Sequence, residues 1–314
     1  MLSRRLLRVK VMQIAYSHYS KGDTSIQQTE KELYYSIAKS HELYHSLLLL
    51  LLELQKFADK RIEFGKQKRR PSHEDLNPNM RFVENAFLKQ LAENDELIRY
   101  AEKNGVSWVN TPETVKGIFN DIVKSSLYLE YVETEAGNYE ADQRFVAKLM
   151  EKVIAPYEGL YSLLEEQSIF WNDESEFIIS MVVKTIKAFD PNKGEDQCLL
   201  PEYKDDEDRD FVKRLIRKTL ANKEEYMKLI RQFTKNWDFD RIAIMDIVLM
   251  QIAIAEVVEF PNIPVNVSLN EYIEIAKYYS TNKSGLFING VLDKIVEHLI
   301  QEKKIVKPLK AAKN

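Results

Sequence analysis

Hydrophobic residues recur at three- and four-residue steps through most of the chain, which is the period of an amphipathic helix. Ser3 can cap a first helix over 3–19, and a long helix is expected over 25–64. Further helices are predicted over 80–104, 111–136, 141–155, 156–170, 175–189, 210–233 (split near 221–222), 267–277 and 285–295. Glycine and proline number only 9 each among 314 residues, too few for a turn-rich β fold. The pattern therefore predicts an all-α protein.

One further helix, predicted over 237–258, is apolar on nearly all sides and should lie at the centre of the fold. Asp246 is the lone acid between Ile244 and Met250. Burying an unpaired carboxylate costs several kcal/mol. Its partner is therefore expected to be Arg241, a helix end or another protein.

The net charge is only -4, so a nucleic-acid role has to depend on a local patch. The first helix offers one, because Arg4, Arg5 and Arg8 share one side and Lys10 is nearby. No acidic residue precedes Asp23, so these cations lack a local counter-charge. The planar guanidinium of arginine suits two-point contact with phosphate. A solvated basic face without a ligand is the alternative.

Three other charged runs are interpreted as surface. The basic run 66–71 is predicted to be a solvated loop, with RNA contact as the alternative. The acidic run 202–210 is predicted to be a solvated linker at a domain boundary, because nothing fixes its carboxylates relative to one another. Beyond residue 300 lies a basic tail containing Lys303, Lys304, Lys307, Lys310 and Lys313, which could add non-specific RNA affinity.

The composition argues against several other classes of protein. A single cysteine, Cys198, allows no internal disulfide or cysteine metal cluster and fits a reducing compartment. The five histidines show no metal-ligand spacing, and no glycine-rich motif joins a strand to a helix. The longest apolar run, 47–52, is too short to span a bilayer, and the N-terminus lacks a signal-peptide core. We expect a cytoplasmic protein with no cofactor, no metal and no membrane contact.

Apolar positions in two segments match at an offset of 66 residues. Phe145 corresponds to Phe211, and Trp171 corresponds to Trp237. The charged positions do not match, since Asp246 corresponds to Ser180. The pattern predicts a partial duplication that kept the core, or else a chance similarity between two amphipathic helix pairs.

Several motifs together resemble the NusB family of transcription antitermination factors. The C-terminal motifs are Trp237-x3-Arg241-Ile242-x3-Asp246, Asn270-Glu271, Ala276-Lys277 and Phe287-Ile288-Asn289-Gly290-Val291-Leu292-Asp293. The N-terminal motif is Arg4-Arg5-x2-Arg8-x4-Gln13-x2-Tyr16. The Phe-Ile-Asn-Gly-Val-Leu-Asp segment is highly specific for that family, although Ile288 replaces its usual valine.

The resemblance implies an all-helical, non-catalytic protein in which the first helix packs with a C-terminal helical subdomain. Members bind the single-stranded boxA element of ribosomal RNA leaders together with the ribosomal protein NusE, and the complex joins the RNA polymerase elongation complex. The residues implied in RNA binding are Arg4, Arg5, Arg8, Lys10, Lys283, Ser284, Phe287 and Asn289. Tyr16 and Asp246 are implied in contact with NusE.

The resemblance covers the two ends of the chain. It predicts an arginine-bearing helix at 1–20, a helical middle region at 21–205, a C-terminal domain at 206–300 and the basic tail at 301–314. Gln251 departs from the family pattern, because members usually carry arginine there. The alternative function is a helical scaffold or protein-interaction module that keeps the fold without boxA specificity.

Overall fold

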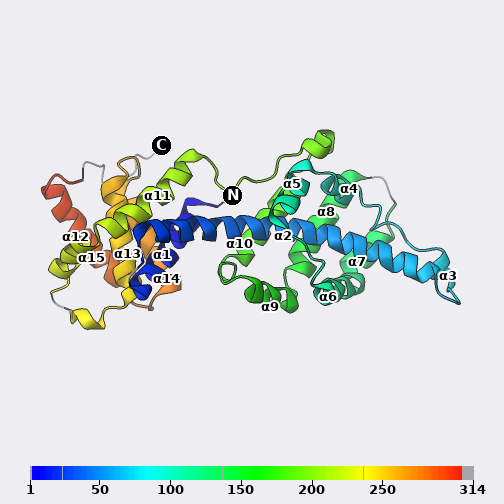
Figure 1. Cartoon of the computed structure of the whole chain (residues 1–314), viewed down its shortest axis with the longest axis horizontal. Helices are drawn as coiled ribbons and strands as arrows, with labels where there is room; N and C mark the ends of the chain where they lie inside the picture. The colour runs from blue at the N-terminus through cyan, green and yellow to red at the C-terminus, as the bar shows by residue number, and fades with distance from the viewer. Residues whose placement is uncertain (1, 23, 136–137, 236, 306–314) are drawn as a thin grey trace. The chain divides into compact units, whose positions relative to one another are not determined.

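The computed structural model describes residues 2–22, 24–135, 138–235 and 237–305, and within these ranges the regular structure is helical with no strand (Figure 1). The all-α prediction is confirmed. The α-helices are α1 (Arg4–Lys21), α2 (Ile26–Lys66), α3 (His73–Leu76), α4 (Ala86–Ala92), α5 (Asp95–Asn104), α6 (Pro112–Lys124), α7 (Ser126–Val132), α8 (Tyr139–Leu149), α9 (Glu158–Gln167), α10 (Ser175–Ala188), α11 (Asp206–Ala221), α12 (Lys223–Phe233), α13 (Ile244–Glu259), α14 (Val265–Tyr279) and α15 (Ser284–Gln301). A π-helix, η1 (Met150–Ile154), and two 3-10 turns, η2 (Pro191–Asp196) and η3 (Phe239–Arg241), complete the list. No helix in the described ranges is long and apolar enough to cross a bilayer.

The helices group into two compact units. The split unit comprises residues 2–37 and 202–305, and the middle unit comprises residues 38–201. The chain leaves the split unit within α2 and returns to it after Pro201. The N-terminal helix and the C-terminal helices therefore fold together although about two hundred residues separate them in the sequence.

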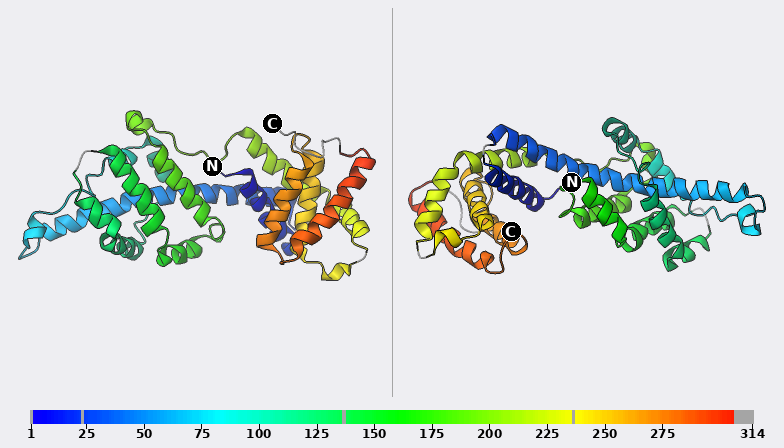
Figure 2. Two further views of the ribbon diagram at one scale, coloured as in Figure 1. Left: turned by 180° about the vertical axis from the view of Figure 1, so that it is seen from behind. Right: turned by 60° about the horizontal axis from the view of Figure 1, so that its bottom comes forward.

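Helix α1 begins where its capping residue predicts. The Ser3 hydroxyl accepts a hydrogen bond from the backbone N–H of Leu6 at 3.4 Å. The helix packs against α11 and α13, and Figure 2 shows it in dark blue beside the yellow and orange helices. Leu7 and Val11 are fully buried, whereas Tyr16 is 38% exposed. The predicted packing of the first helix with the C-terminal subdomain is confirmed.

Helix α13 is the centre of the split unit, as its all-round apolar surface predicts. It contacts α1, α11, α12, α14 and α15, and eleven of its residues are buried. Its predicted start at residue 237 is wrong, because the helix begins at Ile244. Ala243 has an extended backbone (φ −59°, ψ 135°), and the 3-10 turn η3 precedes it. Residues 237–243 are therefore a connecting segment at the surface end of the central helix.

Capping side chains divide two segments that hydrophobic spacing alone predicts as continuous. In the predicted helix 80–104, the Asn94 side chain accepts a hydrogen bond from the N–H of Leu97 and caps a new helix, α5. Ser125 ends the second by capping α7 through the N–H of Tyr128. Both residues satisfy helix N-termini more readily than they continue a helix. The predicted helices 80–104 and 111–136 are each two helices.

The acidic run 202–210 is not a linker over its whole length. Helix α11 begins at Asp206, and the Asp205 side chain caps it by accepting from the N–H of Asp208 at 2.9 Å. Three acidic residues in the first turn favour this helix, because its N-terminus carries partial positive charge. The linker prediction is wrong from Asp206 onward.

Part of the 66-residue offset has a structural counterpart. Helices α8, α9 and α10 follow one another as α11, α12 and α13 do. Asp142 and Asp208, which are 66 positions apart, are both buried and each pairs with an arginine from earlier in the chain. Arg81 Nη2 lies 2.5 Å from Asp142, and Arg4 Nε lies 2.8 Å from Asp208. These pairs support a common packing plan, and the duplication itself stays a prediction.

The three tryptophans differ in the surroundings of their side chains. In the middle unit, the indole N–H groups of Trp108 and Trp171 donate to backbone carbonyls of α2, at Ser46 and Lys39, each at 2.7 Å. In the split unit Trp237 is 47% exposed. Trp237 therefore has a solvent-facing surface that Trp108 and Trp171 do not have.

A buried imidazole lies within the middle-unit part of α2. The His45 ring stacks on the Tyr100 ring with centroids 3.6 Å apart, and its Nδ1–H donates to the carbonyl of His41 at 2.8 Å. Burial, with a smaller contribution from His41, lowers the pKa of His45 to about 3. The ring is therefore neutral in the folded protein at physiological pH.

This depressed pKa predicts acid destabilisation of the middle unit. The unfolded chain takes up a proton near pH 6.5, whereas folded His45 does so only near pH 3. The stabilisation is therefore complete above about pH 6.5 and declines as the pH falls, by about 1.4 kcal/mol per pH unit for one such group. Hydrogen exchange of α2 amides between pH 7 and pH 5 should show this slope, and His45→Gln should reduce it. His73→Gln, at an exposed histidine, is the control and should leave the slope unchanged. A slope that is the same in His45→Gln as in the unmodified chain would contradict the assignment to His45.

Candidate nucleic-acid interface

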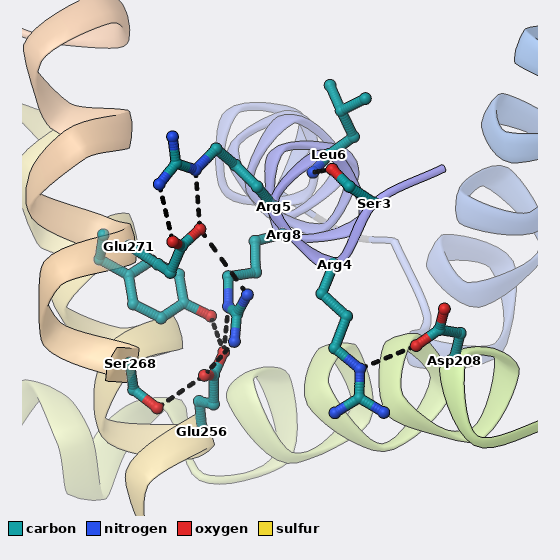
Figure 3. Close-up of polar contacts among 10 residues, drawn as sticks. Ser3, Arg4, Arg5, Leu6, Arg8, Asp208, Glu256, Ser268 and Glu271 are labelled. Atoms are coloured by element: carbon teal, nitrogen blue, oxygen red, sulfur yellow. Dashed lines mark hydrogen bonds and ion pairs between the residues drawn. The ribbon is translucent and has the colours of Figure 1, made fainter. Parts of the chain in front are cut away.

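Each arginine of α1 faces a carboxylate from the other end of the chain (Figure 3). Arg4 Nε donates to Asp208 at 2.8 Å. Arg5 donates two hydrogen bonds to Glu271, at 2.8 and 2.7 Å, and Arg8 donates two to Glu256, at 2.8 and 2.6 Å. These arginines therefore lack a counter-charge only among their neighbours in the sequence. In the folded split unit all three cations have anionic partners.

The pair of Arg8 and Glu256 is a buried junction between α1, α13 and α14. Glu256 is inaccessible to solvent, and it also accepts from the hydroxyls of Ser268 at 2.6 Å and Tyr272 at 2.7 Å. Burial by itself lowers the pKa of Arg8, but the hydrogen bonds to Glu256 and the nearby negative charges raise it on balance. Burial, and then the charge of Glu256, raise the pKa of Tyr272 well above its usual range. Arg8 therefore stays charged and Tyr272 stays a hydrogen-bond donor.

The predicted α1 residues divide into exposed and interior groups. The side chains of Arg4 and Arg5 are substantially exposed, and they line a hollow of about 550 Å³ with Asn262, Pro264 and other residues. Arg8 is buried, and Lys10 is fully buried. Arg8 also lines this hollow but is engaged with Glu256, and neither Arg8 nor Lys10 exposes its side chain at the surface.

Asp246 is satisfied within the fold by two hydroxyl groups. Ser280, which follows α14, donates to one carboxylate oxygen at 2.6 Å, and Ser284, the first residue of α15, donates to the other at 2.9 Å. The sequence interpretation named Arg241, a helix end or another protein as the partner, whereas the donors found within the described residues are two serine hydroxyls. Asp246 joins the start of α13 to the junction between α14 and α15. Ser284 is buried in this junction, although it was predicted to contact RNA.

Beside this junction lies an open aromatic pair. The rings of Trp237 and Phe287 meet edge to face, with centroids 5.4 Å apart and an angle of 69°. They line a hollow of about 440 Å³ together with Arg241, Lys283 and Asp246. Arg241 and Lys283 are exposed, and neither forms an ion pair with a residue of the described ranges. The arrangement can accept a planar ring between cations that are free to meet phosphate.

Trp237 and Arg241 are functional candidates that the sequence interpretation missed. It treated the tryptophan as part of a buried helix, whereas the helix begins later and leaves the ring at the surface. The feature of the sequence that could have indicated them is an aromatic residue followed four positions later by a cation, just before the central helix. Of the other predicted residues, Asn289 is exposed on α15 and Tyr16 is exposed on α1.

The predicted residues that reach the surface, together with Trp237 and Arg241, thus form two groups near opposite ends of α13. The α1 group (Arg4, Arg5) lies at the end marked by Glu256, and the α15 group (Trp237, Arg241, Lys283, Phe287) lies at the end marked by Asp246. These two acids are ten positions apart on the helix, which corresponds to about 15 Å along the axis. No cluster of three or more His, Cys, Asp or Glu side chains suited to a metal ion occurs among the described residues.

Comparison with known proteins assigns the chain to a family. The family model for NusB matches residues 179–297. The transcription antitermination protein NusB of Salinibacter ruber is 39% identical over 132 residues, which span 40% of this chain and 82% of that protein. The chain belongs to the NusB family. This confirms the resemblance drawn from the motifs.

Other NusB proteins match the chain over different lengths. That of Methylacidiphilum infernorum is 34% identical over 126 residues, covering 38% of this chain and 88% of that protein. That of Chloroherpeton thalassium is 45% identical over 85 residues, covering 27% of this chain and 40% of that protein. The solved structure of T. maritima NusB matches 50% of this chain and 95% of its own at 24% identity, with a TM-score of 0.30 that is too low to add to the assignment. Gln251, where NusB proteins usually have arginine, is fully buried and donates to the carbonyl of Lys223 at 3.2 Å.

The junction of Arg8 and Glu256 predicts unequal effects of removing neighbouring arginines. Arg8→Ala should lower the free energy of unfolding by about 3–5 kcal/mol, because it leaves Glu256 charged and buried. Arg5→Ala should cost no more than about 1 kcal/mol, because the pair of Arg5 and Glu271 is largely exposed. Urea denaturation followed by circular dichroism measures both. Equal losses would show that burial does not distinguish the two pairs.

Proposed function

We propose that this protein is a non-catalytic, RNA-binding transcription antitermination factor. The observation that carries the proposal is the pair of Trp237, which is 47% exposed, and partly exposed Phe287, beside two cations that form no ion pair with a described residue. The NusB relatives, which are named as transcription antitermination proteins, support the same role. We propose a boxA-like single strand of a ribosomal RNA leader as the ligand, bound together with NusE within the RNA polymerase elongation complex.

The α15 group would bind the bases. Stacking of a base on an aromatic side chain contributes about 1–3 kcal/mol, and every base has a ring face to offer. Arg241 and Lys283 flank the rings and would neutralise the adjoining phosphates. Ser284 is engaged with Asp246, so its role would be to fix the start of α15 and thereby the position of Phe287. Asn289, exposed two residues later, remains available for a hydrogen bond.

The α1 group would bind the sugar-phosphate backbone. Glu271 holds Arg5 in an exposed pair, and such pairs contribute only about 0–1 kcal/mol, so a phosphate can displace the carboxylate at small cost. Arg4 is similarly accessible on one side. Arg8 and Lys10 would act from the interior, by holding α1 against α13. Phosphate contact by α1 would thus rest on two arginines.

The partner contacts follow from the exposed end of α1 and the Asp246 junction. Tyr16 is 38% exposed and could pack against NusE. Asp246 is 5% exposed and accepts hydrogen bonds from Ser280 and Ser284. For Asp246 to contact NusE, a group of NusE would have to replace one of these hydroxyls, or NusE would have to bind Asp246 and the two serines together. The domains proposed for this role are 1–20 and 206–300. Lys307, Lys310 and Lys313 of the proposed basic tail lie outside the described residues.

One observation favours a second candidate function, a helical scaffold without boxA specificity. All three α1 arginines already have carboxylate partners, which lowers their availability for RNA. The two candidates differ in the affinity that the full chain should show for a boxA-like strand. They are separated by the two experiments that follow.

Removing the aromatic pair should weaken RNA binding. Trp237→Ala or Phe287→Ala should reduce the affinity for a fluorescent boxA-like RNA about ten- to hundred-fold, because each change removes a stacking surface. Fluorescence anisotropy of the full chain, with and without NusE at fixed salt, measures this change. Phe64→Ala is the matched control, since Phe64 is an exposed aromatic residue in the middle unit. Unchanged affinity in both split-unit variants would exclude the aromatic site and favour the scaffold.

Releasing Arg5 from its carboxylate should strengthen RNA binding. Hydrogen bonds from Arg5 lower the pKa of Glu271, so Glu271 is ionised at neutral pH and competes with phosphate. Glu271→Gln should therefore raise the affinity for RNA several-fold at low salt. Arg5→Gln should lower this affinity, and the slope of log affinity against log salt should fall by about one, which corresponds to one lost phosphate contact. A salt titration of RNA affinity measures both effects. If neither variant changes the titration, α1 is not the phosphate-binding surface.

A further inference from the structure

The middle unit carries an apolar hollow on residues outside the RNA site proposed above. The hollow has a volume of about 280 Å³ and lies among α2, α3, α6 and α7. Its lining includes Ile62, Phe82, Val83, Phe119, Val123 and Tyr128. We propose that this α2–α6 hollow docks a segment of a partner protein that carries an aliphatic or aromatic anchor residue flanked by acidic residues.

The floor of the hollow is held by packed aromatic rings. The Phe119 ring lies 5.3 Å from Phe57 and 6.3 Å from Phe82, and Phe82 lies 5.9 Å from Tyr128. Phe82 and Phe119 are almost completely buried, so these rings are fixed by their neighbours. The cavity is therefore formed before a partner arrives, which lowers the entropy lost on binding.

One wall of the hollow depends on a glycine. A Cβ atom at Gly65 would lie 2.8 Å from an Asp75 carboxylate oxygen, so any other residue would require the Asp75 side chain to shift. Asp75 is held in place by Lys68, whose ammonium donates to it at 2.8 Å, and by the backbone N–H of Ser72 at 2.9 Å. These contacts lower the pKa of Asp75 to about 2, with Lys68 the largest cause. The chain turn between α2 and α3 is thus fixed beside the cavity.

The charges around the hollow favour an acidic partner. The loop between α2 and α3 carries Arg69 and Arg70, which are exposed and form no ion pair with a described residue. Arg61 lies at the cavity with its guanidinium 5.7 Å from the centre of the Phe119 ring, and it also lacks an ion pair there. Two acids, Glu74 and Asp75, line the hollow. Asp75 forms an ion pair with Lys68, so only the negative charge of Glu74 opposes these arginines within the lining. The surroundings therefore hold an excess of positive charge.

A protein segment fits these observations better than RNA does. Phe82 and Phe119 are buried between other side chains and offer no free ring face for stacking a base. An aliphatic or aromatic side chain with acidic neighbours satisfies both the cavity and the basic loop. This docking site does not depend on the proposed RNA-binding function, because none of its residues belongs to the split unit.

The probe is a displayed library of random 12-residue peptides, panned on the immobilised full chain. The expected result is enrichment of peptides that combine aliphatic or aromatic residues with Asp or Glu. A synthetic enriched peptide should bind the double variant Arg69→Glu/Arg70→Glu at least tenfold more weakly, because both loop charges are reversed. Val123→Asp, which places a carboxylate in the cavity, should also weaken it. Lys148→Glu/Lys152→Glu, a charge reversal at exposed lysines elsewhere in the middle unit, should leave the affinity unchanged.

Several outcomes would overturn the proposal. They are the absence of enriched peptides, enrichment without acidic residues, and equal binding to the loop double variant. Circular dichroism of each variant distinguishes lost binding from lost folding, and the loop variant changes only exposed side chains. If the loop double variant instead weakens the boxA-like RNA, the loop is an RNA contact and the docking proposal fails. The proposed RNA-binding function is tested separately by Trp237→Ala, so the two can fail independently.

Discussion

The buried ion pair of Arg8 and Glu256 is the contact on which the split unit depends. Two charges removed from water are tolerated only when geometry and hydrogen bonds are complete, and here Glu256 accepts from Arg8, Ser268 and Tyr272 together. The pair fixes the first helix against the central helix, although 248 positions separate the two residues. It is therefore the contact that gives Arg4 and Arg5 a defined place at the surface, beside α14 and α11.

Helix α13 links the two ends of the proposed RNA surface. Near its end, Glu256 joins the α1 group, and near its start, Asp246 joins the junction of α14 and α15. Both acids are buried and both are satisfied by side-chain donors from other helices. The helix rises about 15 Å between these two acids and would hold the aromatic site and the arginine site in a fixed arrangement. A single strand could then be stacked at one end and neutralised at the other.

The middle unit has a different surface chemistry. The split unit presents a partly exposed aromatic pair beside cations that form no ion pair with a described residue, which suits bases and phosphates. The middle unit presents an apolar cavity with buried rings and a basic loop, which suits an acidic protein segment. The indole N–H groups of its two tryptophans, Trp108 and Trp171, donate hydrogen bonds to backbone carbonyls of α2, whereas Trp237 of the split unit is 47% exposed. A family member with such an additional unit would therefore gain a protein contact without altering its RNA surface.

The sequence by itself determined the helical class, the family, the central position of α13 and the Ser3 cap, because periodicity, capping and motif spacing act within a few residues. It did not reveal the breaks at Asn94 and Ser125, where a side-chain cap prevails over a continuing hydrophobic pattern. It placed Trp237 in a buried helix and left Arg8 without a counter-charge. Only the tertiary structure decided these points, since the exposure of Trp237 depends on where α13 begins. The partner of Arg8 comes from a helix at the far end of the chain, and no local pattern records such a contact.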